Sequence, residues 1–221
     1  MSSDTGLKVF RDKIDQIDTD IVDLIKQRMS IVKEVGLYKE SVNDDFFIKS
    51  AREVDMIRDL TKSLDGIVDK KVVFNIWRSL IVSANVAEQD LSVYIHNPQK
   101  NAQLLNIASN YYANLLKIVE INDIDKFLSL KNDGVGRILG ISTKVNDGSW
   151  QKILDKNQNL KIFAKIGDDN NELYLLAQKP VEKSNKDNSV FCVDGKLIEV
   201  EGNKNIDDKE GFLGVFGVVD K

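Results

Sequence analysis

The sequence predicts an α+β protein, in which an all-helical, three-helix N-terminal domain (residues 1–92) is followed by a small α/β C-terminal domain (residues 93–221). Two observations predict this division. Before residue 95 there is no proline, glycine is scarce, and apolar residues recur at helical spacing. After it, short β-rich runs alternate with short helical stretches, which is typical of α/β folds. A chain of 221 residues can hold two small domains, each with a modest core.

The N-terminal half contains three predicted helices. Their approximate ranges are Leu7–Glu40, Ser50–Leu64 and Lys70–Leu91. An Asn-Asp-Asp run follows the first helix, and Gly66 with Asp69 separates the second from the third. These breaks indicate one long helix followed by two shorter ones.

The C-terminal half is predicted to contain seven strands and three short helices. The predicted strands are Leu91–Ile95, Leu115–Ile121, Arg137–Ser142, Leu160–Ile166, Leu173–Ala177, Ser189–Val193 and Leu197–Val200. The predicted helices are Gln99–Ala113, Ile124–Leu130 and Ser149–Leu154. No Gly-rich phosphate loop, internal repeat or low-complexity segment interrupts this pattern.

Composition argues against several classes of function. The net charge is −4 and the lysines are mixed with acids, so we expect no nucleic-acid partner. No basic segment precedes an apolar run at the N-terminus, so we expect neither a signal peptide nor a membrane segment. We therefore expect the protein to be cytoplasmic. One cysteine, Cys192, and one histidine, His96, do not make the usual zinc clusters, and we expect no metal. His96 precedes Asn97 and Pro98 and is interpreted as a turn residue at the domain junction.

Two cations interrupt the apolar face of the long first helix. The apolar members of this face are Phe10, Ile14, Ile17, Ile21 and Leu24. Arg28 and Lys39 occupy later positions on the same face. A cation on a core-facing stripe is costly to desolvate unless an anion meets it, which favours a buried anionic ligand. The alternative is that both side chains extend along the surface and keep their charges in water.

The spacing of these cations constrains the ligand and the assembly. Arg28 and Lys39 are about 16 Å apart along the helix and within about 20° of the same face, so their long side chains could hold opposite ends of a small dianion. Arg11 is about 25 Å from Arg28 and could reach the same ligand only from a second copy. A long helix with two short companions also buries too little apolar area by itself. An intertwined homodimer satisfies both requirements.

Motifs in the helical half resemble the all-helical chorismate mutases. They are Phe10–Asp18 with Arg28, Val35–Lys39, Ala51–Glu53, and the third-helix segment that ends in Glu88. The resemblance covers about residues 7–92. It implies a domain-swapped helical homodimer with two shared active sites. It also implies the rearrangement of chorismate to prephenate, without metal or organic cofactor, in the synthesis of phenylalanine and tyrosine.

The resemblance implies roles for four cations. Arg11 would cross the dimer to one carboxylate of chorismate, and Arg28 would hold the other carboxylate in a bidentate contact. Lys39 would contact the ether oxygen and a carboxylate, and Arg52 would add positive field nearby. The planar guanidinium suits the carboxylate contacts better than an ammonium does.

Two acids and two departures from the family pattern complete the implied site. Glu53 would accept a hydrogen bond from the ring hydroxyl. Glu88 would face the ether oxygen and must be protonated to donate there, so activity should decline as pH rises. Lys49 stands where many relatives have Asp, and Ala84 where many have Ser. Neither change removes a cation that would bind a carboxylate of chorismate. We therefore expect weaker substrate binding and a working site.

The C-terminal half resembles a shortened prephenate dehydratase domain with its downstream regulatory strands. The resemblance is carried by Asn170–Leu176 followed by Ser189–Val193. The Thr-Arg-Phe triplet that carries dehydration in that family is replaced by Asn171-Glu172-Leu173, which has neither the hydroxyl nor the cation. We therefore expect no dehydratase activity, and interpret this half as structural, regulatory or partner-binding.

Two alternatives to the mutase remain open. One is a non-catalytic regulatory or partner-binding protein built on a mutase scaffold. The other is an isochorismate pyruvate lyase, which uses the same scaffold to release salicylate and pyruvate. Retention of the predicted cations and acids favours an enzyme over a scaffold, because a scaffold needs no buried cations.

Overall fold

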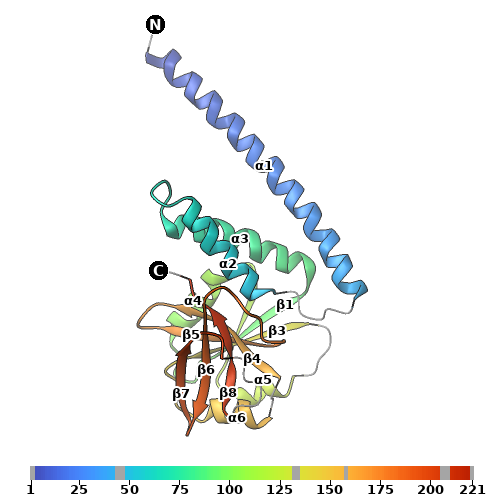
Figure 1. The fold of residues 1–221 in the computed structure, drawn as a ribbon, viewed down its shortest axis with the longest axis vertical. Helices are drawn as coiled ribbons and strands as arrows, with labels where there is room; N and C mark the ends of the chain where they lie inside the picture. Colours follow the sequence, from blue (N-terminus) through green and yellow to red (C-terminus); the bar gives the residue numbers. More distant parts are fainter. Residues whose placement is uncertain (1–2, 43–47, 131–134, 157–158, 205–209, 220–221) are drawn as a thin grey trace. The chain divides into compact units, whose positions relative to one another are not determined.

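The protein is described by a computed structural model over residues 3–42, 48–130, 135–156, 159–204 and 210–219. It consists of two units (Figure 1). The first is the long helix α1 (Ser3–Ser41), and the second is a compact body that begins with helix α2 (Ser50–Ser63). The α+β class is confirmed, and the proposed domain boundary after residue 92 stays a prediction.

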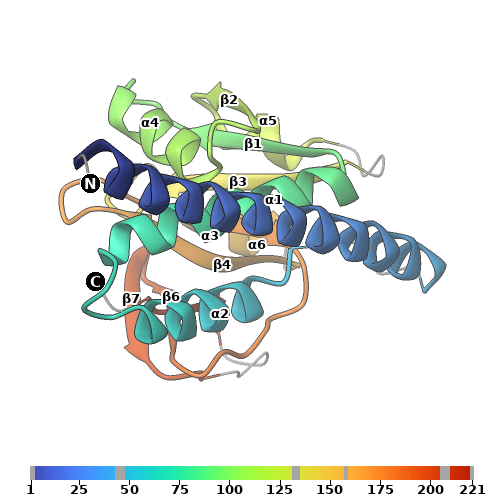
Figure 2. The same ribbon diagram turned by 90° about the horizontal axis from the view of Figure 1, so that it is seen from above.

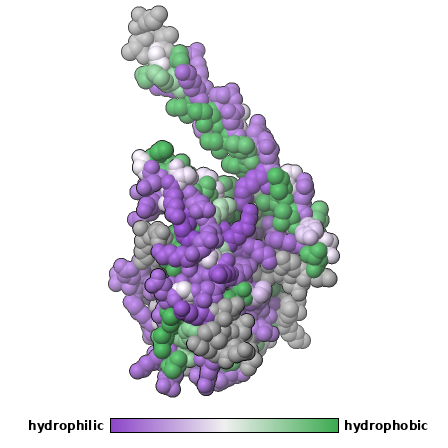
Figure 3. Space-filling model, in the orientation of Figure 1, coloured by the Kyte–Doolittle hydropathy of each residue, from purple (hydrophilic) through white to green (hydrophobic). Residues whose placement is uncertain are grey.

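Helix α1 is amphipathic along its whole length. It has 39 residues and contains the predicted range Leu7–Glu40. Hydrophobic side chains gather along one side of the helix (Figure 3). Phe10 and Ile14, four residues apart and therefore on the same face, are both exposed. A single helix cannot bury such a stripe against itself, so the apolar face of α1 requires a partner surface.

The second unit contains the other helices and all of the described strands. Its helices are α2, α3 (Lys70–Glu88), α4 (Ala102–Tyr111), α5 (Ile124–Leu128) and α6 (Ser149–Lys156). Its strands are β1 (Leu91–His96), β2 (Lys117–Ile121), β3 (Gly136–Ser142), β4 (Leu160–Gly167), β5 (Glu172–Gln178), β6 (Asp187–Val193), β7 (Lys196–Glu201) and β8 (Phe212–Gly217). The seven predicted strands are confirmed within two residues at each end. The third helix was predicted too long, because Leu91 already belongs to β1.

The eight strands form one mixed sheet in the order β2-β1-β3-β5-β4-β8-β6-β7. Strand β1 is parallel to β2 and β3, as expected where α4 and α5 connect the strands. Strand β5 lies between β3 and β4 and runs antiparallel to both. Strand β8 connects the hairpin β6–β7 to the rest of the sheet. It is antiparallel to β6 and parallel to β4.

Helices cover both faces of this sheet. Helices α2, α3 and α4 pack on one face, and α5 and α6 lie on the opposite face (Figures 1 and 2). Strand β5 shows the alternation directly, because Leu175 faces the α4 side while Leu176 faces the α6 side. A bulge between Ile162 and Ala164 of β4 switches which face receives its apolar side chains.

Strand β8 was missed in the sequence because glycines punctuate it. Gly214 has φ +147°, and a Cβ there would come within 2.4 Å of the Ile162 carbonyl oxygen on the neighbouring strand. The glycine is therefore needed for the close approach of β8 to β4. A glycine-rich segment of this kind looks like a turn in sequence although it forms an interior strand.

The interpretation of His96 as a turn residue was wrong. It is the last residue of β1 and is buried. Its Nε2 lies 2.7 Å from Asp147 Oδ2 and 3.1 Å from Ser149 Oγ. Because Asp147 and Ser149 belong to the segment that begins α6, the imidazole joins the end of β1 to the start of that helix.

Asp147 should make folding stability sensitive to acid. Its burial alone would raise its pKa, but hydrogen bonds from Ser149 and His96 outweigh burial and lower the pKa. A carboxyl with a lowered native pKa stabilises the fold above its unfolded pKa, and this contribution is lost as pH falls through the native value. The free energy of unfolding should therefore fall as the pH drops below about 5, and less steeply in Asp147→Asn. Urea denaturation at a series of pH values measures the slope; an unchanged slope in the variant contradicts this role, and Asp155→Asn serves as the surface control.

Candidate active site in the helical region

The first turn of α2 carries three of the predicted site residues. Lys49 occupies the N-cap position and is half-buried, Arg52 is exposed, and Glu53 is buried. The acidic side chain in the first turn is favourable because the helix dipole is positive at this end. The sequence therefore places Arg52 and Glu53 on different faces of one helical turn.

The carboxylate of Glu53 is held by two donors from α3. Arg78 Nη1 donates to Glu53 Oε2 over 2.7 Å, and Asn85 Nδ2 donates to Oε1 over 3.0 Å. Both members of the ion pair are buried, with Glu53 8 % and Arg78 4 % exposed. A buried carboxylate needs such partners, because leaving it unpaired in this environment costs several kcal/mol.

Arg78 extends the same network to α4. Its guanidinium carbon lies 3.9 Å from the centre of the Tyr111 ring, and its Nε donates to the Tyr111 carbonyl oxygen over 3.1 Å. Burial raises the pKa of both Tyr111 and the neighbouring Tyr112, so these phenols are neutral at ordinary pH. The guanidinium therefore joins α2, α3 and the end of α4 at one point.

The remaining site residues of this unit lie on α3. Ala84 is buried beside Asn85, the residue that contacts Glu53. Glu88 is the last residue of α3 and is half-buried, one turn beyond Ala84. The structure thus brings Glu53 and the Ala84 turn of α3 together, while the roles implied for Ala84, Glu88 and Lys49 stay predictions.

The other three predicted residues belong to the separate unit α1. Arg11, Arg28 and Lys39 all lie within that helix, and Lys39 is in its last turn. Their spacing along the helix follows the rise and rotation expected from the sequence. Their implied contacts with substrate also stay predictions.

Sequence reasoning missed Arg78 and Asn85, although a signal for Arg78 was present. Arg78 interrupts the buried face of α3 formed by Val73, Ile81 and Val82. This is the same pattern that singled out Arg28 and Lys39 on the first helix. Asn85 offers no comparable signal, because an asparagine in a helix is usually exposed.

The described residues offer neither a metal cage nor a membrane segment. Among them, no three histidine, cysteine, aspartate or glutamate side chains gather closely enough to hold a metal ion. None of the described helices combines the length and apolar composition needed to span a bilayer.

Residues 10–90 match the model of the chorismate mutase type II family. This region covers most of α1 and all of α2 and α3, and it ends just before β1. It contains every predicted site residue, so the resemblance of the helical half to chorismate mutases is confirmed. No curated protein and no solved structure matches the chain.

The chorismate mutase match does not reach the C-terminal half, and its resemblance to prephenate dehydratase stays a prediction. The Asn171-Glu172-Leu173 triplet has structural contacts. Asn171 Oδ1 accepts from Asn101 Nδ2, Glu172 pairs with Lys165 over 3.2 Å, and Leu173 is fully buried. Asn171 is therefore held by a hydrogen bond, Glu172 by an ion pair and Leu173 by packing in the core.

Breaking the Glu53–Arg78 pair should destabilise the second unit strongly. Arg78→Met leaves a buried carboxylate with one donor lost, and we expect a loss of about 3–5 kcal/mol in the free energy of unfolding. The double variant Glu53→Leu with Arg78→Met removes both charges and should lose less than the sum of the single changes, with a coupling of about 2–3 kcal/mol. Urea denaturation of all four proteins completes the cycle.

A matched surface pair provides the control for this cycle. Lys152 and Asp125 form an exposed ion pair at 3.0 Å. Lys152→Met should leave the free energy of unfolding nearly unchanged, because exposed pairs are screened by solvent. Equal effects of Arg78→Met and Lys152→Met would contradict the structural importance assigned to the buried pair.

Proposed function

We propose that this protein is a homodimeric chorismate mutase that converts chorismate to prephenate in the synthesis of phenylalanine and tyrosine. The observation that carries the proposal is the family match over residues 10–90, within which the expected cations Arg11, Arg28, Lys39 and Arg52 are all present. In the proposed site each carboxylate of chorismate meets an arginine, Arg28 from one protomer and Arg11 from the partner. Lys39 faces the ether oxygen.

These residue types suit a pericyclic rearrangement. The reaction needs no nucleophile and no proton transfer, but the breaking C–O bond places partial negative charge on oxygen. A donor fixed at that oxygen stabilises the transition state more than the ground state. Clamps on both carboxylates hold the reactive chairlike conformer, which lowers the entropic part of the barrier.

Unpartnered apolar surface supports the dimer. The stripe of α1 includes Ile17 and Leu24, which are 56 % and 61 % exposed. Helix α3 carries a second stripe, on which Val72, Ile76 and Val86 are 40–48 % exposed. Burying a large aliphatic side chain contributes about 1.5–3 kcal/mol, so stripes of this kind favour association with a second copy.

Isochorismate pyruvate lyase and a non-catalytic scaffold remain the competing proposals. All three use the same helices, and the cations favour either enzyme over the scaffold. Loss of chorismate absorbance identifies the mutase, and appearance of salicylate fluorescence from isochorismate identifies the lyase. No reaction with either compound would refute both enzymatic proposals, while an assay with prephenate tests the C-terminal half separately.

Replacing Lys39 should lower turnover of chorismate greatly. In Lys39→Ala the ether oxygen loses its cationic donor, and we expect kcat to fall by about two to three orders of magnitude. Lys33→Ala removes a lysine from a different face of the same helix and should keep activity within about twofold, since it lies outside the proposed site. A spectrophotometric chorismate assay measures both, and equal activities would argue against Lys39 as the catalytic donor.

Mixing two inactive variants should restore activity if the site is shared. Arg11→Ala and Arg28→Ala each remove one carboxylate clamp, so each alone should be nearly inactive. A mixed dimer has one site with both arginines intact, and random exchange should therefore recover about a quarter of wild-type activity. Light scattering reports the dimer in the same samples. Dimers that exchange subunits without gaining activity would contradict the crossing of Arg11.

A further inference from the structure

The first turn of α2 is attached to the loop between β5 and β6 (residues 179–186), far along the chain. Lys179 Nζ donates to the Ile48 carbonyl oxygen over 3.1 Å and to Ser50 Oγ over 3.0 Å. Glu182 Oε2 accepts from the Ala51 amide over 3.2 Å and from Ser50 Oγ over 3.3 Å. The two loop side chains also pair with each other over 3.2 Å.

Helix α2 lacks a cap from its own sequence. Its N-cap residue is Lys49, which makes no side-chain capping hydrogen bond. The first amides of a helix have no intrahelical acceptor and need one from elsewhere. Glu182 supplies it, and its negative charge also suits the positive end of the helix dipole.

Burial makes the position of Lys179 specific. Its side chain is 2 % exposed and its ammonium lies 5.2 Å from the centre of the Phe163 ring. Burial lowers the pKa of Lys179, against the opposing effects of Glu182 and Glu53. A buried ammonium must keep its oxygen partners, so the loop cannot shift without a large loss of stability.

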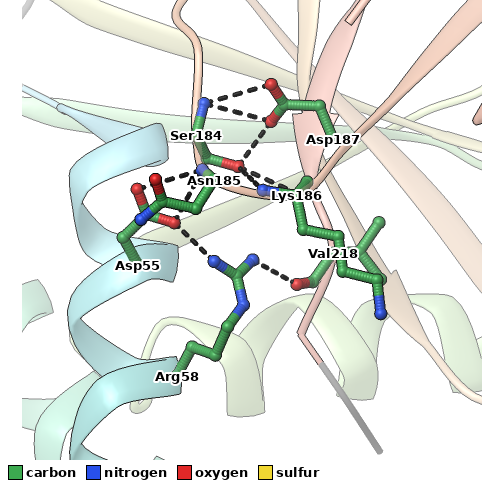
Figure 4. A network of polar contacts seen from close by, with 7 residues as sticks. All are labelled: Asp55, Arg58, Ser184, Asn185, Lys186, Asp187 and Val218. Atoms are coloured by element: carbon green, nitrogen blue, oxygen red, sulfur yellow. Dashed lines mark hydrogen bonds and ion pairs between the residues drawn. The ribbon is translucent and has the colours of Figure 1, made fainter. Parts of the chain in front are cut away.

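The same loop contacts α2 a second time, one turn further on (Figure 4). The Asn185 amide donates to both carboxylate oxygens of Asp55 over 3.0 and 3.2 Å. Asp55 also accepts from Arg58, whose second nitrogen donates to the Val218 carbonyl oxygen after β8. Arg58 is buried, so this contact also excludes water.

Arg52 and Glu53 lie between these two attachments. We propose that the 179–186 loop of the α/β part positions the first turn of α2 for the mutase reaction, with Lys179 and Glu182 as positioning residues. This inference rests on the proposed mutase function. It assigns to the region beyond the family match a direct role in catalysis by the helical region, because the field of Arg52 depends on where this turn is held.

The test compares activity with local exchange in the full chain. Glu182→Ala removes the acceptor for the Ala51 amide. We expect kcat/KM for chorismate to fall about tenfold and hydrogen exchange of the first-turn amides of α2 to rise about tenfold, the size of a lost helix cap. Lys179→Met should act in the same direction. Glu182→Gln keeps an amide oxygen as acceptor and should stay within about threefold of wild type on both measures.

A matched lysine and a milder change serve as controls. Lys165→Met removes a lysine of β4 that pairs with Glu172 and Glu199 and makes no described contact with α2, so it should leave both measures within twofold. Ser50→Ala removes only the hydroxyl shared by Lys179 and Glu182. It should raise first-turn exchange even if the charge-removing variants fail to fold.

The outcomes separate the two proposals. Wild-type protein without mutase activity would refute the proposed function, while the exchange data would still decide whether the loop holds α2. Unchanged first-turn exchange in Glu182→Ala and Ser50→Ala would overturn the attachment. Faster exchange with an unchanged kcat/KM in an active enzyme would overturn the positioning role. An equal loss of activity in Glu182→Gln and Glu182→Ala would also overturn the positioning role of Glu182.

Discussion

The buried ion pair between Glu53 and Arg78 constrains how three helices of the second unit are arranged. Glu53 comes from α2, Arg78 comes from α3, and the guanidinium rests on Tyr111 at the end of α4. Each charge is satisfied only while these three helices keep their relative positions, because either one alone in this interior would cost several kcal/mol. The two short helices of the family-matched region are thereby joined to the α/β part at one shared polar centre, in addition to the contacts of α2 with the 179–186 loop.

This attachment determines which surfaces of the helical region remain for other partners. Helix α2 packs on the sheet, and Val82 of α3 joins the same hydrophobic core. The opposite side of α3 leaves Val72 and Ile76 exposed. Helix α1 has an apolar stripe that no single helix can bury. Most of the large hydrophobic side chains that stay exposed among the described residues belong to α1 and to the outer side of α3. These are the elements that an intertwined dimer would bring together.

Most elements could be predicted from the sequence because hydrophobic periodicity is a local signal. It indicated α2 and strands such as β5 within two residues, and α1 within four. Strand β8 escaped because its glycine at 214 is explained only by the approach of β4, which is more than 50 residues away in the sequence. Arg78 also stood on an apolar helix face, yet its partner Glu53 is 25 residues distant. Which carboxylate meets a buried cation is a property of tertiary packing.

The contacts of Glu53 also bear on how two acids can share the proposed site. A carboxylate paired with a guanidinium offers acceptor oxygens only, and its two oxygens provide about four acceptor positions. Arg78 and Asn85 occupy two of them. A substrate hydroxyl could therefore donate to Glu53 without displacing either residue, which is the role that the resemblance implies. Donation of a hydrogen bond to the ether oxygen, beside Lys39, would then fall to Glu88, at the far end of α3 and outside this ion pair.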